Sequence, residues 1–324
     1  DWCTVPGGGG PYRDPEFVEN GRRVHVHGYK TDHSGDCALN FLDRHHRNPF
    51  YLLVPFYAPH TPYNYQPETY RRWYNNSTFP CFPNTPMNPW QNAGLAHLHG
   101  SREAKHAYSA LIAGMDANAG RILQRLDDLG VRDNTLVVFT ADQGWCAGHH
   151  GVWGKGNGTW PFNMYEESLH VPLIWNHPHR IQAGATPSPM VSSYDYFPTI
   201  LEYLGIPAPS DPARVGRSYA PFLKGETPAW SNRLYFEYEY VRGVRTENLK
   251  YIERAKPWPS ELYDLETDPG ETANLVANAA YRKQRDALRT DLTRYFAANG
   301  APPIGQWRST TKQHLTEYHA VAPR

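Results

Sequence analysis

Two adjacent side chains, Asp142 and Gln143, directly follow a short apolar, β-rich stretch that ends at residue 141. A carboxylate and an amide carbonyl are hard oxygen donors, which suit Ca²⁺ or Mg²⁺. Gln is a poor zinc ligand, so a zinc pair is disfavoured. Because α/β enzymes place ligands at the carboxyl ends of their strands, the pair predicts a metal site there. The alternative is that Asp142 only caps the turn after the strand.

A histidine, His60, follows another apolar run, residues 50–57, and lies in the sequence Ala-Pro-His-Thr-Pro. Both strands would then deliver polar groups to the same rim of the sheet, where α/β enzymes place their sites. The prolines on either side stiffen the backbone of His60, which suits a residue whose position matters. A histidine in a loop can equally serve only as a hydrogen-bonding residue.

A lysine, Lys155, has glycine on both sides, and two adjacent histidines, His149 and His150, precede it. Flanking glycines let the backbone approach an anion closely, and a lysine there pairs with a sulfate or phosphate oxygen as a point charge. A solvated surface lysine is the alternative. Neighbours in an extended loop point apart, so we expect one histidine, His150, to face the pocket, or else to make a structural hydrogen bond.

The elements that must position these residues follow the order strand, long helix, strand, which is typical of a parallel α/β sheet. A helix capped by Thr31 or Asp32 is expected to run to about residue 44, followed by a buried strand at residues 50–57. Apolar residues at helical spacing predict a long helix over residues 101–129, closed by Gly130. Strands are expected at residues 135–141 and 171–175, and a short helix at 193–204 with Pro198 in its first turn.

The sequence pattern changes near residue 207, where Pro-rich loops begin. We therefore expect a catalytic α/β domain over residues 1–207 and a subdomain over 208–324. The subdomain should carry short antiparallel strands at 234–241, 244–246 and 250–253, then a turn at 267–270 and a helix at 280–298. Residues 1 to about 30 are rich in Gly and Pro and are expected to form a loop.

Composition excludes some classes of function. The 324 residues contain 32 Lys+Arg and 32 Asp+Glu, so the net charge near zero argues against a nucleic-acid-binding protein. The longest apolar run, residues 50–58, is too short to span a bilayer, and no signal peptide is visible. The four cysteines (Cys3, Cys37, Cys81 and Cys146) are widely spaced, which leaves open disulfides or buried free thiols.

Taken together, these stretches resemble the sulfatases of the alkaline-phosphatase superfamily, which use a formylglycine nucleophile. The matching stretches occur in order over nearly the whole chain: residues 28–32 (GYKTD), 50–62 (FYLLVPFYAPHTP), 115–130, 140–144 (TADQG), 149–155 (HHGVWGK), 164–172 (MYEESLHVP), 194–205 (YDYFPTILEYLG), 245–246 with 250–252, and 261–274 (ELYDLETDPGETAN). The resemblance implies an α/β fold with a mostly parallel central sheet flanked by helices. It also implies a small C-terminal α+β subdomain that carries an antiparallel sheet.

The resemblance also implies roles for the candidate residues. Asp142 and Gln143 are expected to ligate one Ca²⁺, or Mg²⁺, and His60 and Lys155 to contact the sulfate group and the leaving oxygen. Sulfate-ester cleavage needs cationic groups around the oxygens and a proton donor for the departing alkoxide. His60 is the candidate donor, Lys155 assists it, and His150 is a further candidate substrate contact. The expected substrate is a carbohydrate or aryl sulfate, and the expected location is secreted, periplasmic or lysosomal.

One motif of the family is not found upstream of His60, where the resemblance places it. Its formylglycine arises from Cys or Ser in C/S-x-P-x-R, and neither Cys3-Thr4-Val5-Pro6 nor Cys81-Phe82-Pro83-Asn84-Thr85 matches. We therefore expect the nucleophile and further metal ligands to lie in an N-terminal segment of the same enzyme outside this chain. Two alternatives stay open: a phosphodiesterase or phosphonate monoester hydrolase, and a non-catalytic relative that binds sulfated glycans. Neither a nucleic-acid partner nor a membrane span is expected.

Overall fold

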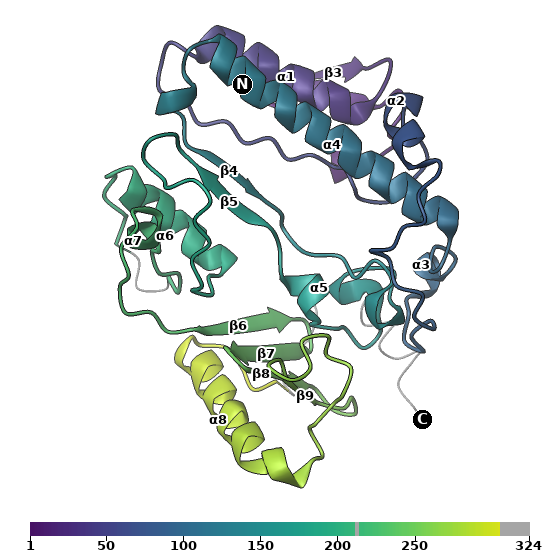
Figure 1. Ribbon diagram of the computed structural model, residues 1–324, viewed down its shortest axis with the longest axis vertical. Helices are drawn as coiled ribbons and strands as arrows, with labels where there is room; N and C mark the ends of the chain where they lie inside the picture. Colours follow the sequence, from purple (N-terminus) through teal and green to yellow (C-terminus); the bar gives the residue numbers. More distant parts are fainter. Residues whose placement is uncertain (211–213, 305–324) are drawn as a thin grey trace. The chain divides into compact units, whose positions relative to one another are not determined.

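The computed structural model describes residues 1–210 and 214–304 and divides into two compact units (Figure 1). Unit 1 contains residues 1–84, 97–137 and 176–179. Unit 2 contains residues 85–96, 138–175 and the described residues from 180 onward. Compactness thus groups residues 138–175 with the C-terminal part of the chain. The division at residue 207 stays a prediction based on sequence texture.

Unit 1 is built on two long helices, α1 (Lys30–His45) and α4 (Arg102–Asp128), which pack side by side (Figure 1). Both helices confirm the periodicity-based predictions. α4 begins at Ser101, whose side chain accepts a hydrogen bond from the backbone N–H of Ala104. α1 is preceded by Tyr29 rather than capped by Thr31 or Asp32. Gly35 allows the close approach of the helices, because a Cβ at this position would overlap the buried side chain of Asn118.

The first 25 residues form a three-stranded antiparallel sheet, so the predicted loop is wrong here. Its strands are β1 (Cys3–Thr4), β2 (Glu16–Glu19) and β3 (Arg22–His25). β2 and β3 are joined by Asn20 and Gly21, both with positive φ, 47° and 87°. This is the turn chemistry that a two-residue hairpin requires. A disulfide between Cys3 and Cys37 links β1 to α1.

Residues 50–57 do not form the predicted buried strand. The segment pairs with no strand among the described residues, and its side chains alternate between exposed and half-buried. Tyr51 and Leu53 are 69% and 68% exposed. A strand is defined by hydrogen bonds to a neighbour, which an apolar run cannot supply by itself. The following region holds the short helix α2 (Glu68–Arg71).

The predicted strands on either side of the candidate site are confirmed. β4 (Val137–Thr140) pairs with β5 (Leu173–Asn176), and the short helices α3 (Ala93–Ala96) and α5 (Glu166–Leu169) lie in unit 2. α6 (Ser193–Tyr203) begins with a capping box between Ser192 and Asp195 and packs against α7 (Ala220–Leu223). Pro198 lies in the second turn of α6, not in the first.

A four-stranded antiparallel sheet follows, in the order β6 (Arg233–Tyr238), β7 (Val241–Thr246), β8 (Leu249–Arg254) and β9 (Glu261–Asp264). The last helix, α8 (Arg282–Ala298), packs on β7 and β8 (Figure 1). Leu288, Leu292 and Phe296 of α8 share a core with Val244 and Tyr251. This confirms the predicted antiparallel sheet with one helix, although the prediction missed β9. No helix in the described ranges is long and apolar enough to cross a bilayer.

Candidate functional site

Asp142 and Gln143 lie just beyond the end of β4, as the sequence predicts, and both side chains are exposed. The Gln143 amide nitrogen donates a hydrogen bond to the Asp142 carboxylate, with a Nε2 to Oδ2 distance of 3.3 Å. That contact leaves the Gln143 carbonyl oxygen and the second oxygen of Asp142 as hard donors. The donor set therefore fits Ca²⁺ or Mg²⁺, although these cations need about six or more oxygen ligands in all.

The loop that carries Lys155 folds back tightly on itself. The backbone N–H of Cys146 donates to the carbonyl of Gly154 at 2.7 Å, and that of Gly148 donates to the carbonyl of Val152 at 2.8 Å. Gly154 has a φ of 156°, and a Cβ there would lie 2.6 Å from the Cα of Gly158. Only glycine can occupy this position without moving the backbone, so Gly154 fixes the path of the chain into Lys155.

A chain of buried hydrogen bonds joins the Lys155 loop to the end of β4. The Ser168 hydroxyl donates to Asn163 Oδ1 at 2.7 Å, and Asn163 Nδ2 donates to the Lys155 carbonyl at 3.0 Å. Because the hydroxyl proton of Ser168 is used, its oxygen accepts from the Cys146 thiol at 3.2 Å. The Ser168 carbonyl also accepts from the backbone N–H of Gly144 at 3.1 Å. Ser168 thus connects the Lys155 loop to Gly144, next to the Asp142–Gln143 pair.

The Lys155 side chain is half-buried and makes no ion pair with another described residue. Its ammonium group has therefore not been neutralised by a neighbouring carboxylate. A partly desolvated, uncompensated cation next to flanking glycines can hold an anion oxygen. The contact of Lys155 with an anion stays a prediction.

His149 and His150 both contact the same carboxylate, that of Glu167. His150 Nε2 lies 2.8 Å from Glu167 Oε2, and His149 Nδ1 lies 3.2 Å from Oε1. The expectation that the two neighbours point apart is wrong because His150 has a φ of 55°, which departs from an extended loop. The His150 ring also stacks on Tyr165 at 3.7 Å between centroids. With Nε2 engaged by Glu167, a substrate contact by His150 stays a prediction.

The charge of Glu167 is stabilised by these histidines. Burial by itself would raise the pKa of the Glu167 carboxyl, but the hydrogen bond and charge of His150 hold it below its ordinary value. His150, Glu167 and Glu271 each offer a ligand atom within 4.8 Å of the others. Glu271 already pairs with Lys250 at 2.5 Å, so this group is compensated without a metal.

A buried ion-pair network joins Glu166, at the start of α5, to strands β7 and β8. The sequence did not predict this network. The Lys250 ammonium is fully buried and pairs with Glu166 at 2.9 Å and with Glu271 at 2.5 Å. Glu166 also pairs with Arg245, and its backbone N–H donates to Glu271 at 2.7 Å. Burial alone would raise the pKa of Glu166, but Lys250 and Arg245 hold it below its usual range. The network fixes the start of α5 on strands β7 and β8.

His60 lies in unit 1, in an exposed loop that is held from its backbone. Its carbonyl accepts a hydrogen bond from the buried Tyr12 hydroxyl at 2.8 Å, and Tyr57 donates to the Thr61 carbonyl at 2.5 Å. His60 Nδ1 lies 2.5 Å from the same Thr61 carbonyl. A carbonyl oxygen only accepts hydrogen bonds, so Nδ1 of His60 carries a proton. Nε2 is therefore the nitrogen that can exchange a proton with a substrate.

A buried lysine supports the same loop. Lys30 donates from its ammonium to the carbonyls of Gly9 and Gly10 at 3.0 and 2.8 Å, and lies 4.1 Å from the Tyr57 ring centroid. Burial lowers the pKa of Lys30 to about 8. The Gly-rich stretch at residues 7–10, which was expected to be a loop, is therefore held by Lys30 next to the segment that carries His60.

The structure brings four of the predicted residues into one unit. Asp142, Gln143, His150 and Lys155 belong to unit 2, whereas His60 belongs to unit 1. The convergence of His60 with the other four stays a prediction.

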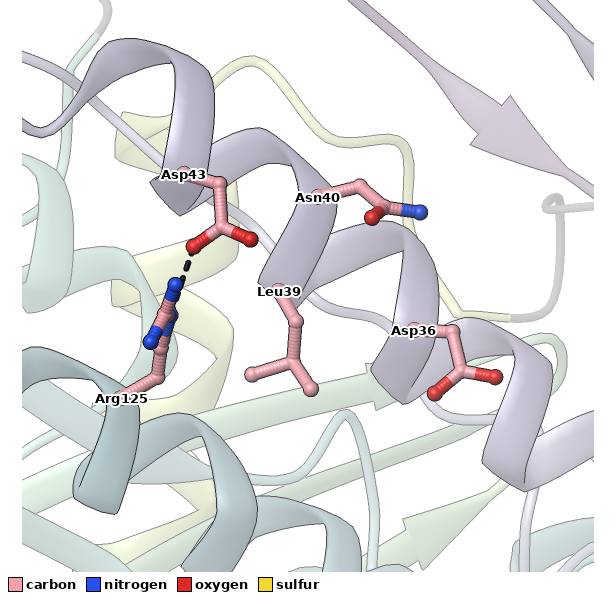
Figure 2. A pocket seen from close by; sticks show the side chains of 5 residues that line it. All are labelled: Asp36, Leu39, Asn40, Asp43 and Arg125. Carbon is pink, nitrogen blue, oxygen red and sulfur yellow. Dashed lines mark hydrogen bonds and ion pairs between the residues drawn. The ribbon is translucent and has the colours of Figure 1, made fainter.

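A pocket in unit 1 lies between α1 and α4, and none of the candidate site residues lines it (Figure 2). Asp36, Leu39, Asn40 and Asp43 come from α1, and Arg125 comes from α4. Arg125 pairs with Asp43 at 2.6 Å, and Asp36 pairs with Arg121 at 2.5 Å. The charged side chains that line the pocket are thus paired across the two helices. We therefore interpret the pocket as part of the α1–α4 packing contact rather than as an active site.

Comparison with known proteins matches this chain to one family over most of its length. Residues 2–206 match the family model described as Sulfatase, and residues 148–298 match the model described as N-sulphoglucosamine sulphohydrolase, C-terminal. An N-acetylglucosamine-6-O-sulfatase from Bacteroides thetaiotaomicron is 28% identical over 364 residues, covering 86% of this chain and 63% of that protein. A multifunctional alkaline phosphatase superfamily protein from Trinickia caryophylli is 28% identical over 292 residues, covering 75% and 55%.

A solved structure agrees with this match. A protein in complex with its substrate D-glucosamine-2-N,6-O-disulfate superposes with a TM-score of 0.81 and 27% identity, covering 94% of this chain and 77% of that chain. The chain spans 63% and 55% of the two curated relatives named above. The expected α/β, alkaline-phosphatase-like fold class is confirmed. The chain belongs to the sulfatase family of the alkaline-phosphatase superfamily.

Proposed function

We propose that the protein containing this chain hydrolyses sulfate esters of a carbohydrate. The observation that carries the proposal is the similarity, over 94% of the chain, to a structure bound to a disulfated glucosamine. The similarity to an N-acetylglucosamine-6-O-sulfatase supports the same class of substrate. An amino sugar with a 6-O-sulfate is therefore the first substrate to test.

In the proposed site Lys155 neutralises charge on the sulfate oxygens, and His60 donates a proton to the departing sugar oxygen. The Thr61 carbonyl holds the Nδ1 proton of His60, so the proton for transfer is the second one, which Nε2 carries when the ring is in its imidazolium form. Asp142 and Gln143 would hold a divalent cation, which fits their hard oxygens. When bound, the cation supplies charge stabilisation to the sulfuryl group.

The nucleophile is proposed to be a formylglycine supplied by polypeptide outside this chain, because no C-x-P-x-R sequence occurs among its 324 residues. The one S-x-P-x-R sequence, residues 210–214, lies far downstream of His60, where the family resemblance does not place the nucleophile. Mass spectrometry of the whole protein tests this point. An unmodified cysteine together with full activity would refute it.

The main experiment measures kcat/KM of the whole protein on N-acetylglucosamine 6-sulfate, an aryl sulfate, a phosphate diester and a phosphonate monoester. We expect the sugar sulfate to be the best substrate. A higher kcat/KM for the phosphate diester or the phosphonate would contradict the proposal and favour the sister activity. Binding of the sugar sulfate without turnover by protein that carries the formylglycine and the cation would favour the non-catalytic relative.

Site variants test the residue roles in the same assay. Lys155→Ala should lower kcat by about 10²–10³-fold, the usual loss for one group that stabilises developing charge. His60→Ala should lower it by about 10²–10⁴-fold, the usual contribution of an acid catalyst. Lys224→Ala, at an exposed position of unit 2, is the matched control and should not change kcat.

Metal dependence provides a separate check. Removal of divalent cations with a chelator should abolish turnover, and Asp142→Asn should raise the Ca²⁺ concentration needed to restore it. Unchanged activity after exhaustive chelation would refute the metal assignment.

A further inference from the structure

Four side chains with metal-binding chemistry converge in unit 1, and none of them belongs to the proposed sulfatase site. Cys3, Glu19, His33 and Cys37 each offer one ligand atom, and these atoms lie within 4.8 Å of one another. Cys3 and Glu19 are directly opposite each other in the β1–β2 register, so they lie on the same face of the sheet. His33 and Cys37 are one turn apart on α1 and share a helix face. A strand pair and a helix thus each contribute two ligands.

The separation between His33 and Cys37 suits a tetrahedral ion, because His33 Nε2 lies 3.6 Å from Cys37 Sγ. His33 Nε2 also lies 2.8 Å from Glu19 Oε1, a hydrogen-bond distance that would lengthen to about 3.4 Å around a tetrahedral zinc ion. A nitrogen at about 2.1 Å and a sulfur at about 2.3 Å from a tetrahedral zinc ion lie about 3.6 Å apart. The ring of His33 is held by an edge contact with the buried Phe17, with centroids 4.6 Å apart. The imidazole therefore already lies beside the sulfur of Cys37.

The two sulfur atoms are joined as a disulfide in the structure, with Cα atoms 6.5 Å apart. A disulfide does not need an imidazole and a carboxylate beside it, yet both are present and half-buried. Two thiols, an imidazole and a carboxylate form a donor set that suits Zn²⁺ better than Ca²⁺ or Mg²⁺. The same position can therefore serve two chemical states of the cysteines.

We propose that Cys3, Glu19, His33 and Cys37 form a zinc site in the reduced protein, so that this position holds either the disulfide or one Zn²⁺. With a tertiary phosphine as reductant, the disulfide, the phosphine and one water give two thiols and the phosphine oxide. Zn²⁺ then replaces the two thiol protons, which pass to solvent, and His33 binds as the neutral imidazole. The proposal does not depend on the sulfatase activity.

The chain itself, reduced with a phosphine, freed of reductant and kept without oxygen, is the material for the test. Addition of cobalt(II) chloride should produce the visible bands of a tetrahedral cobalt centre and a thiolate-to-cobalt charge-transfer band, saturating at one ion per chain. Zinc chloride should then bleach both bands. The oxidised chain should show neither band, because its sulfurs are not available as thiolates.

Variants separate this site from other thiols. Cys37→Ser and His33→Ala should each weaken cobalt binding by more than the 10- to 100-fold that loss of an outer partner usually costs. Cys81→Ser, which removes an exposed free cysteine, is the matched control and should bind as the parent chain does. Far-ultraviolet circular dichroism of each reduced variant identifies any that has unfolded, and Glu19→Gln provides a second, milder ligand change.

Two results would overturn the proposal. One is a folded, reduced chain that gives no tetrahedral cobalt spectrum. The other is a spectrum that persists in Cys37→Ser at the parent affinity, which would place the metal elsewhere.

Discussion

The two cysteines outside the disulfide differ in chemistry because their surroundings differ. Cys81 is exposed, whereas Cys146 is fully buried and donates its thiol proton toward Ser168. Burial raises the pKa of Cys146 to about 12, so its thiolate is nearly absent at neutral pH. Cys146 is therefore a structural residue of the Lys155 loop rather than a nucleophile.

Thiol titration tests this distinction. In the native, unreduced chain at pH 8, an aromatic disulfide reagent should react rapidly with one thiol, and Cys81→Ser should abolish that reaction. Denaturant should expose a second thiol. Raising the pH to 9 should leave Cys146 slow, because its pKa lies far above that value. Two rapidly reacting thiols in the native chain would contradict the assignment.

At the scale of elements, sequence periodicity was sufficient for the long helices and insufficient for the sheets. α1, α4 and α8 each carry apolar residues at helical spacing and were predicted to within a few residues. The hairpin β2–β3 was missed although Asn20-Gly21 is a strong turn signal, because its strands are short and half of their residues are charged. Residues 50–57 show the opposite error, because a strand was predicted where none forms. An apolar run indicates that a segment can be buried, but it does not show that a neighbouring strand is present to pair with it.

Glycine provides a test of the α1–α4 contact. Gly35→Ala should destabilise unit 1 by about 1–3 kcal/mol, because the new methyl group overlaps Asn118 in a packed interior. Asn118 cannot move without losing its hydrogen bonds to Asp32 and to the Gly114 carbonyl. Denaturant unfolding measures the change.

The matched control is Gly120→Ala in α4, where an added Cβ meets nothing within 4 Å. It should stabilise the helix by up to about 1 kcal/mol. Equal effects of the two substitutions would show that helix propensity, not the contact, governs both.

At the scale of the molecule, the part of the site that the sequence could not predict is the part made by distant residues. Asp142, Gln143 and Lys155 were found because each follows a local signal, a strand end or a pair of glycines. Lys250 pairs with Glu166 and Glu271, and Glu271 bonds to the backbone 105 residues earlier. No local pattern encodes such pairs. These pairs, together with the apolar core that Phe162 and Met164 share with Val241, attach residues 138–175 to the C-terminal sheet.

Removal of the central cation tests this attachment. Lys250→Met should destabilise unit 2 by about 3–5 kcal/mol, because two carboxylates lose a fully buried partner. Lys283→Met, at an exposed position of α8, is the matched control and should change stability little. Thermal unfolding of both variants gives the comparison, and equal midpoints would show that the network does not hold the segment.

The hydrogen bond from Tyr12 to the His60 carbonyl has a practical consequence for how the protein can be shortened. The first dozen residues have the Gly-rich composition of a dispensable leader, yet Tyr12 is fully buried and Lys30 grips Gly9 and Gly10. Trimming the chain past residue 12, by a protease or by gene design, would remove the support beneath His60 while leaving His60 itself intact. Safe boundaries for a shortened enzyme therefore lie upstream of this stretch.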